Sequence, residues 1–279
     1  MRQPYRLESI TLRDVGVFEN TRFDFPPIKS AEADAEKAEI HIFTGPNGCG
    51  KSTLLYALAA VFEPYNNPLS PVASRLRKID SQVSYTFMNE SSLYSVPTFG
   101  GLRHVGMIRA GEEKEVIFSN HEVIRDSQLR WSGYYSQFGS ETDKSVPFTA
   151  FAYSGQSSSA EKFDVSVIEE ITDSPFENAL SFSATVRPKT IAQWIALNRS
   201  NAALALQDGA LEEITRYDLA LERISAFIKS VCDLDVSFRL ERNPRTVSLI
   251  IDGEIVPFNV LPDGLKSIIG WISDLALRL

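Results

Sequence analysis

The alternation of hydrophobic and polar positions predicts strands at the start of the chain and a helix soon after them. Residues 5–25 alternate apolar and polar side chains in two runs linked at Gly16, which predicts two antiparallel strands. Residues 39–44 (EIHIFT) are rich in β-branched and aromatic side chains and predict a short strand. The run at 52–62 (STLLYALAAVF) predicts an apolar helix.

The middle of the chain carries further strand patterns. Residues 82–131 contain several short apolar runs typical of strands, with a hairpin turn expected at Gly111-Glu112. Residues 146–153 (VPFTAFAY) predict a buried strand that leads into a polar loop containing Gln156. Residues 189–232 then repeat apolar side chains at helical spacing, with charges between them, which predicts packed helices.

The end of the chain predicts a strand, a hairpin and a final helix. Residues 234–240 alternate as a strand, and the runs at 246–251 and 254–258 flank Asp252-Gly253, a strong hairpin signal. The run VSLIIDGE superficially resembles an apolar strand that ends in a metal-binding acid and a catalytic base. Because the turn signal is strong, we interpret Asp252 and Glu254 as turn residues.

Composition and charge narrow the class of protein. The 279 residues are 43% hydrophobic and 23% charged, as in an ordinary globular protein. The net charge of −8 argues against a broadly basic nucleic-acid surface, although a local basic groove is compatible with it. A small cluster at Arg75, Arg77 and Lys78 could meet phosphate or nucleic acid, but we expect a solvated face.

The cysteines and the lengths of the apolar runs indicate the cellular compartment of the protein. Cys49 and Cys232 form neither a disulfide framework nor a zinc pattern and suit a reducing cytosol. No apolar run approaches the roughly 20 residues needed to span a bilayer, and the N-terminus has no signal-peptide core. We therefore expect a cytoplasmic protein with no membrane contact.

The strongest chemical signal lies between the predicted strand at 39–44 and the predicted helix at 52–62. This segment matches the phosphate-loop pattern of Gly, four residues and Gly-Lys-Ser/Thr. A strand, a glycine-rich turn and a helix, in that order, are the context that this motif requires. The candidate nucleotide-binding residues are Gly45, Pro46, Asn47, Gly48, Cys49, Gly50, Lys51, Ser52 and Thr53.

The residue types explain how such a loop binds a nucleoside triphosphate. Glycines permit positive φ and let bare backbone N–H groups form a concave anion site, and the helix start adds partial positive charge. Lys51 can reach the β- and γ-phosphates as a catalytic residue, and the Ser52 hydroxyl can ligate Mg²⁺. Thr53 can add a hydroxyl near the α-phosphate. The expected cofactors are ATP and Mg²⁺.

Gln156 is a second candidate for catalysis and metal binding. A glutamine directly after a core strand can contact Mg²⁺ and the attacking water, but a loop glutamine without a role fits the sequence equally well. The stretch Leu261-Pro262-Asp263-Gly264-Leu265-Lys266-Ser267 opens the final helix, whose free N–H groups Asp263 can cap. On its own, this stretch indicates only a capped amphipathic helix.

Taken together, the loop at 45–53 and the stretch LPDGLKS resemble ATPase heads of the ABC superfamily, in the branch that contains RecF, SMC-type and OLD-type proteins. There, an N-terminal strand pair precedes GPNGCGKSTLL-like residues, and a Leu-Ser-x-Gly-type signature begins a helix far downstream. The resemblance implies that two copies face each other across ATP. The signature of one copy, here including Asp263 and Gly264, then contacts the nucleotide of the other. It also implies, weakly, that Arg13 approaches the phosphates or the base.

Two departures from that family pattern change the expectation. Pro262 stands where the family usually has Ser, so only backbone donors and Gly264 remain at that point. The family places its Mg²⁺-binding Asp, its catalytic Glu and a switch His after the signature, and this sequence ends at Leu279, about where that part would begin. We therefore expect the N-terminal portion of a head, incomplete at its C-terminus, that binds ATP and hydrolyses little alone.

The expected fold class is an α/β phosphate-loop NTPase with an N-terminal antiparallel β subdomain and a helical insertion. Within one partial head, we expect residues 1–65 to hold the first strands and the loop, 66–186 a strand-rich part, 187–233 the helical insertion, and 234–279 the hairpin and the signature-like helix. The motifs expected of a GTPase are missing from the sequence, and a small-molecule kinase would not need such a helix.

Two functions remain open at this point. The first is an ATPase that dimerises on ATP and drives a partner, which the resemblance places in DNA metabolism or in anti-phage defence beside a nuclease or other effector. DNA contact is implied by resemblance alone. The second is a nucleotide-sensing module without turnover, which the missing acidic pair favours for the chain as given.

Overall fold

The computed structural model of the chain describes residues 6–26, 40–63, 70–88, 96–98, 101–110, 116–119, 149–155, 165, 167–241 and 246–278. The chain divides into two compact units, Met1–Phe151 and Ala152–Leu279. Each unit has its own hydrophobic core.

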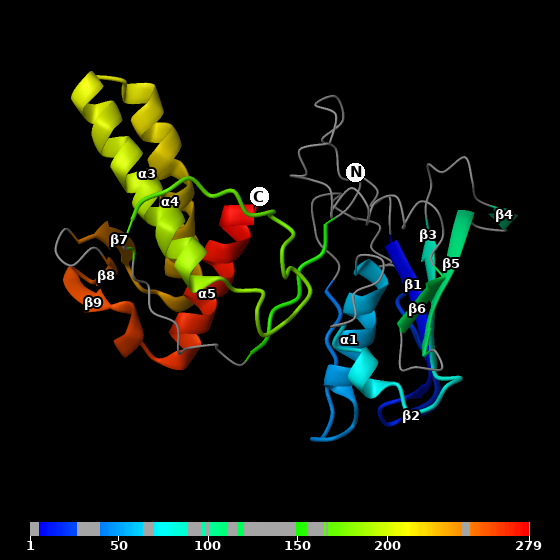
Figure 1. Cartoon of the computed structure of the whole chain (residues 1–279). Coiled ribbons are helices and arrows are strands. Elements are labelled where there is room, and N and C mark those ends of the chain that lie inside the picture. The colour runs from blue at the N-terminus through cyan, green and yellow to red at the C-terminus, as the bar shows by residue number, and fades with distance from the viewer. Residues whose placement is uncertain are drawn as a thin grey trace, which may run out of the picture. The chain divides into compact units, whose positions relative to one another are not determined.

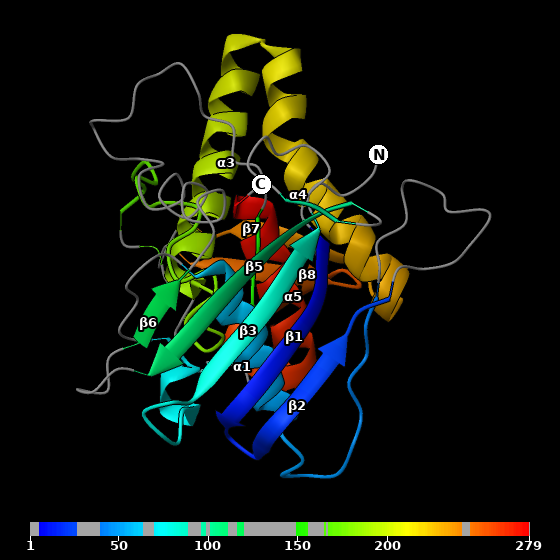
Figure 2. The same ribbon diagram turned by 90° about the vertical axis from the view of Figure 1, so that its right-hand side faces the viewer.

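The described part of the first unit is an antiparallel sheet covered by the helix α1 (Figures 1 and 2). The sheet has the order β2-β1-β3-β5-β4, with β6 paired to β5. Its strands are β1 Arg6–Val15, β2 Phe18–Asp24, β3 Gln82–Met88, β4 Val96–Thr98, β5 Gly101–Ala110 and β6 Val116–Ser119. Helix α1, Lys51–Phe62, packs against this sheet, and a short 3₁₀ helix, η1 Ala73–Arg75, follows.

Period-two burial along β1, an inner strand of this sheet, identifies the face that packs against α1. Ile10 and Leu12 alternate with polar neighbours and are fully buried against Leu54 and Ala57 of α1. Strand β1 pairs with β2 in the register Ile10↔Phe23 and with β3 in the register Ile10↔Tyr85. The predicted strand pair at 5–25 is therefore confirmed.

The second unit combines a helical hairpin, a small sheet and the final helix (Figure 1). Helices α3 Pro188–Asp208 and α4 Leu211–Cys232 are joined at Gly209, whose φ of 72° ends α3 in the left-handed conformation. Strands β7 Val236–Leu240, β8 Val247–Ile251 and β9 Glu254–Pro257 form an antiparallel sheet. A short 3₁₀ helix, η2 Phe258–Val260, leads to α5, Asp263–Arg278.

The turn between β8 and β9 settles the interpretation of the VSLIIDGE run. Asp252 and Gly253 both have positive φ, 50° and 89°, and Ile251 pairs with Glu254 across the turn. Positive φ at both central residues is the geometry of the tight hairpin that Asp-Gly favours. Asp252 and Glu254 are turn residues, as predicted.

Two predicted strands are not formed where the structure describes them. Residues 40–44 run as an irregular segment, with Ile40 78% and Ile42 80% exposed. The opposite side of this segment packs on the core, because the rings of His41 and Phe43 lie 5.3 and 6.3 Å from that of Phe25. The side chains of residues 40–43 therefore alternate between two faces, as in a strand. A strand also needs a backbone partner, and residues 40–44 have none among the described residues.

The buried strand expected at 146–153 is also wrong for its described part. Residues 149–152 are irregular, and Tyr153 makes one isolated bridge to Phe182. The Ala152 N–H donates to the Ala179 carbonyl at 2.8 Å, so this backbone is satisfied by a loop instead of a strand. The turn at Gly111-Glu112 and Gln156 lie outside the described residues.

Candidate phosphate-binding site

The loop at 45–50 turns the chain directly into α1. Gly48 and Gly50 have φ values of 85° and 99°, in the left-handed region that glycine adopts without strain. Gly50 is the N-cap of α1, no side chain caps the helix start, and its first turn carries no acidic residue. Helix α1 therefore begins without an internal group that would neutralise its positive end.

Backbone donors at this helix start are available to a ligand. The N–H groups of Gly50, Lys51 and Ser52 donate to no acceptor among the described residues, whereas the Leu54 N–H already bonds to the Gly50 carbonyl at 2.9 Å. Free N–H groups at a helix N-terminus are the usual donors to phosphate oxygens. A Cβ added at Gly48 would meet no atom within 4 Å, so open space lies beside the loop.

The Lys51 side chain is turned back over the loop. Its ammonium donates to the carbonyls of Gly45 and Pro46, both at 2.8 Å, and lies 3.8 Å from the Cys49 sulfur. These bonds fix the ammonium at the loop. Since the thiol is a weak acceptor, an incoming phosphate oxygen can take the third ammonium donor without breaking either carbonyl bond. The Ser52 hydroxyl, on an exposed residue, is the group that could ligate Mg²⁺.

The β1–β2 turn supports the start of α1, a contact that the sequence did not reveal. A Cβ on Gly50 would lie 2.5 Å from the Phe18 ring and 2.6 Å from a Val17 methyl. A Cβ on Gly16 would lie 2.8 Å from the Thr53 hydroxyl oxygen. Thr53 is 5% exposed beneath this turn, which makes it a packing residue as well as a candidate ligand. Gly16 and Gly50 are thus needed for close packing.

The basic cluster after η1 holds the same turn. The Lys78 ammonium lies 2.9 Å and the Arg77 guanidinium 3.4 Å from one Asp14 carboxylate oxygen, and the Ser81 hydroxyl donates to the Asp14 carbonyl at 2.8 Å. The hydrogen bond from Lys78 holds the pKa of Asp14 below its ordinary value. Although Arg77 and Lys78 are exposed, as expected, they also fix Asp14, whose φ is 52°.

The other predicted site residues that the structure describes fall in two places, one in each unit. Arg13 pairs with Asp80 at 3.7 Å on an exposed part of the first unit. Asp263 and Gly264 are exposed in the first turn of α5, in the second unit. The Asp263 carboxylate lies 3.5 Å from the Lys266 ammonium, and no capping bond from it to a backbone N–H is found in the described part of α5.

Farther along, α5 carries a buried ionic network that the sequence analysis did not identify. Asp274 is fully buried, and its carboxylate accepts from Arg278 at 2.6 Å and from the Tyr153 hydroxyl at 3.0 Å. Arg278 also donates to backbone carbonyls, including that of Thr185 at 2.7 Å. Burial, followed by the charge of Asp274, raises the pKa of Tyr153. The network ties α5 to the segment that ends just before Gln156.

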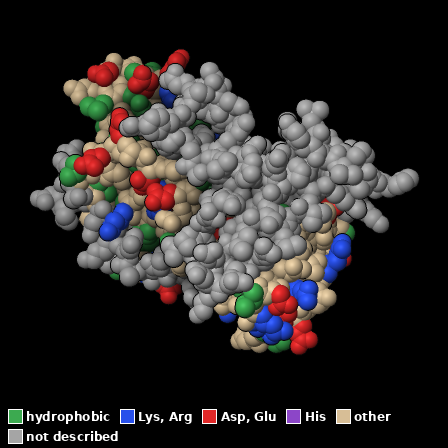
Figure 3. Space-filling model, turned by 45° about the vertical axis from the view of Figure 1, so that its right-hand side comes forward, with side chains coloured by type: hydrophobic (Ala, Val, Ile, Leu, Met, Phe, Trp, Pro, Cys, Tyr) green, Lys and Arg blue, Asp and Glu red, His purple; other side chains and the backbone are tan. Residues whose placement is uncertain are grey.

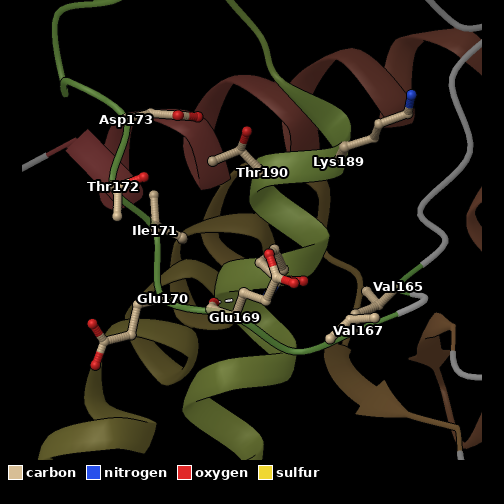
Figure 4. Close-up of a pocket in the computed structure, with 10 residues that line it drawn as sticks. Val165, Val167, Glu169, Glu170, Ile171, Thr172, Asp173, Lys189 and Thr190 are labelled. Atoms are coloured by element: carbon tan, nitrogen blue, oxygen red, sulfur yellow. Dashed lines mark hydrogen bonds between the residues drawn. The ribbon is translucent and has the colours of Figure 1, made fainter.

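A cavity of about 400 Å³ lies beside the start of α3 (Figure 4). Among the described residues, its lining includes the carboxylates of Glu169, Glu170 and Asp173 and one cation, Lys189. The Gln193 side chain donates to the Glu169 carbonyl at 2.8 Å at this wall. The predominance of carboxylates makes this cavity unsuitable for a triphosphate, which leaves the loop at 45–53 as the candidate phosphate site.

The mixed α/β fold and the loop define a phosphate-loop NTPase. The model of the AAA_23 family, described as an AAA domain, matches residues 9–231, and the chain belongs to that family. The predicted class, an ATP-binding ATPase of the ABC superfamily, is confirmed. No helix in the described part of the chain is long and apolar enough to cross a membrane.

Individual relatives are more distant. The chain is 24% identical over 117 residues to the xylose import ATP-binding protein XylG of Geobacillus kaustophilus (strain HTA426). The aligned stretch covers 41% of this chain and 22% of that protein. It is also similar to the structure of the recombination mediator protein RecF-ATP in the RecFOR pathway. That match has 10% identity and a TM-score of 0.43, and it covers 99% of this chain and 80% of that chain.

Proposed function

We propose that the loop at 45–53 binds MgATP and that the bound nucleotide joins two copies of the chain. The observation that carries the proposal is the uncapped start of α1, with three free N–H groups beside the fixed Lys51 ammonium. These groups would bind the β- and γ-phosphates, and Ser52 would ligate Mg²⁺. Gln156 would contact the same metal ion and the attacking water, a role that follows from the resemblance alone.

In this proposal, the first turn of α5 faces the γ-phosphate held by the partner copy. Asp263 and Gly264 are exposed, and nothing lies within 4 Å of a Cβ added at Gly264, which leaves room for a ligand there. Bound Mg²⁺ and ATP supply the phosphoryl chemistry, and the chain supplies positioning and charge stabilisation. ATP-driven association would then move an effector protein.

The two glycine variants Gly264→Glu and Gly264→Ala separate a role in association from a role in folding. Because the site is open, both side chains fit the isolated chain. In sedimentation velocity with MgATP, wild type and Gly264→Ala should form dimers. Gly264→Glu, which places a carboxylate against the γ-phosphate, should stay monomeric while it still binds ATP. Dimers of equal strength in Gly264→Glu would contradict the trans contact.

A nucleotide-sensing module without turnover is the second candidate. It is favoured by the position of Asp252 and Glu254 in the β8–β9 turn, which removes the acidic pair that the sequence offered most directly as metal ligand and base. Phosphate release distinguishes the two functions. The purified chain should release little phosphate from ATP, and robust turnover that is lost in Lys51→Ala would favour the ATPase reading for the chain alone.

A further inference from the structure

The free end of the α3–α4 hairpin carries large apolar side chains that the fold does not use. Leu204, Leu206 and Leu211 are 58%, 66% and 72% exposed. Figure 1 shows this end of the hairpin extending beyond the β7–β9 sheet and α5 of the same unit. We call these three leucines, with Asp208, Glu212 and Glu213, the hairpin tip.

The hairpin is held together without the tip leucines. Small buried side chains, Ala202 and Ala205, at 7% and 4% exposure, allow α3 to approach α4 closely. Below the tip, the Arg199 guanidinium of α3 bonds to the Asp218 carboxylate of α4 at 2.6 Å. The tip leucines can therefore be changed with little loss of packing, and their apolar area is available for a partner.

The charge around the leucines decides what kind of partner fits. Asp208, Glu212 and Glu213 are exposed and form no ion pair among the described residues. Of the two flanking arginines, Arg199 is paired with Asp218 and the exposed Arg216 offsets one of the three carboxylates, so the tip keeps a net negative charge. Figure 3 shows acidic and hydrophobic side chains together at this end of the hairpin, at the upper left. The local charge opposes nucleic acid, an anionic membrane surface and a second identical tip, since all of these are acidic. It favours a basic segment.

We propose that the hairpin tip docks a basic amphipathic segment of another protein, whose apolar side chains cover Leu204, Leu206 and Leu211 while its Lys or Arg residues pair with the three carboxylates. This inference goes beyond the nucleotide site and does not depend on it. It places the contact with a partner protein at the free end of the α3–α4 hairpin, in the second unit.

The test uses three labelled helical peptides with the full chain. One has a leucine face flanked by lysines, one keeps that face but has glutamates, and one keeps the lysines but replaces leucine with serine. Fluorescence anisotropy should show tightest binding of the leucine–lysine peptide, weakened by salt. The variant L204S/L206S/L211S should bind it at least tenfold more weakly. The control I255S/V260S changes exposed apolar residues of the same unit and should bind like wild type.

Exchanging the three tip carboxylates for lysines tests the charge preference separately from the burial of the leucines. The variant D208K/E212K/E213K should reverse the preference and bind the leucine–glutamate peptide at least tenfold better than wild type does. Equal binding of the leucine–lysine peptide by wild type and L204S/L206S/L211S would overturn the proposal. Tip-dependent binding to phosphatidylcholine–phosphatidylglycerol vesicles, or nucleotide-free self-association lost in that variant, would also overturn it, because the occupant would then be a membrane or a second copy.

Discussion

Glu63, at the end of α1, is a buried carboxyl group whose ionisation should weaken the fold. Its side chain has no exposed area, and neither carboxylate oxygen has a hydrogen bond among the described residues. Burial raises its pKa from 4.5 to about 7, and the nearby Ser70 hydroxyl opposes this shift without reaching hydrogen-bond geometry. The substitution Glu63→Gln keeps the shape of the side chain and removes its ionisation.

The direction and the size of the effect follow from the two pKa values. Below pH 4.5, the carboxyl is neutral in both the folded and the unfolded chain. Between pH 4.5 and about 7, the unfolded chain loses this proton while the folded chain keeps it, so the stability of the wild type falls. Each pKa unit corresponds to about 1.4 kcal/mol, so the full loss is about 3 kcal/mol and is complete above the folded pKa.

Urea unfolding at a series of pH values from 4 to 8 measures this effect as the difference between wild type and Glu63→Gln. The difference should move in favour of Glu63→Gln by about 3 kcal/mol across this range, mostly between pH 4.5 and 7. Glu254→Gln changes an exposed turn carboxylate and serves as the control for the general effect of pH. A difference that stays constant within about 0.5 kcal/mol would refute the reasoning, because it would mean that Glu63 ionises equally in both states.

Two further changes test close packing and the buried network. Gly50→Ala should destabilise the chain by at least about 1 kcal/mol more than Gly253→Ala in urea unfolding, since both glycines have positive φ but only Gly50 faces packed atoms. Equal losses would remove the packing argument. Arg278→Met should cost about 3 kcal/mol, because the buried Asp274 then keeps only the more distant Arg187, 3.9 Å away. Arg22→Met breaks only an exposed pair with Asp24 and should cost less than about 1 kcal/mol. Similar costs for the two would show that Asp274 is not held by that pair.

Local patterns predicted much of the fold. The alternation at 5–25, the Asp-Gly turn and the helical spacing over 189–232 each depend on neighbours in sequence, and each is seen in the structure. The strands expected at 39–44 and 146–153 are not formed in their described parts, 40–44 and 149–153, because strand formation depends on a distant backbone partner that a local pattern does not specify. The candidate phosphate loop stands out in the sequence because its spacing is fixed within nine residues.

Contacts between distant residues could not be predicted in the same way. The packing of the β1–β2 turn on Gly50 brings together residues from separate elements, and no spacing rule connects them. The link from Tyr153 to Asp274 joins residues that lie even farther apart in sequence, 121 positions. One signal was available, because Asp274 and Arg278 stand four residues apart on a predicted helix, among apolar side chains, as an ion pair would.

Calorimetric titration of ATP with Mg²⁺ into the full chain tests the central claim, that the loop before α1 binds a triphosphate. The wild type and Lys189→Ala, which changes an exposed lysine of α3, should bind with the same affinity. Lys51→Ala should weaken binding at least a hundredfold, since it removes the ammonium held at the loop. Unchanged affinity in Lys51→Ala would contradict the account.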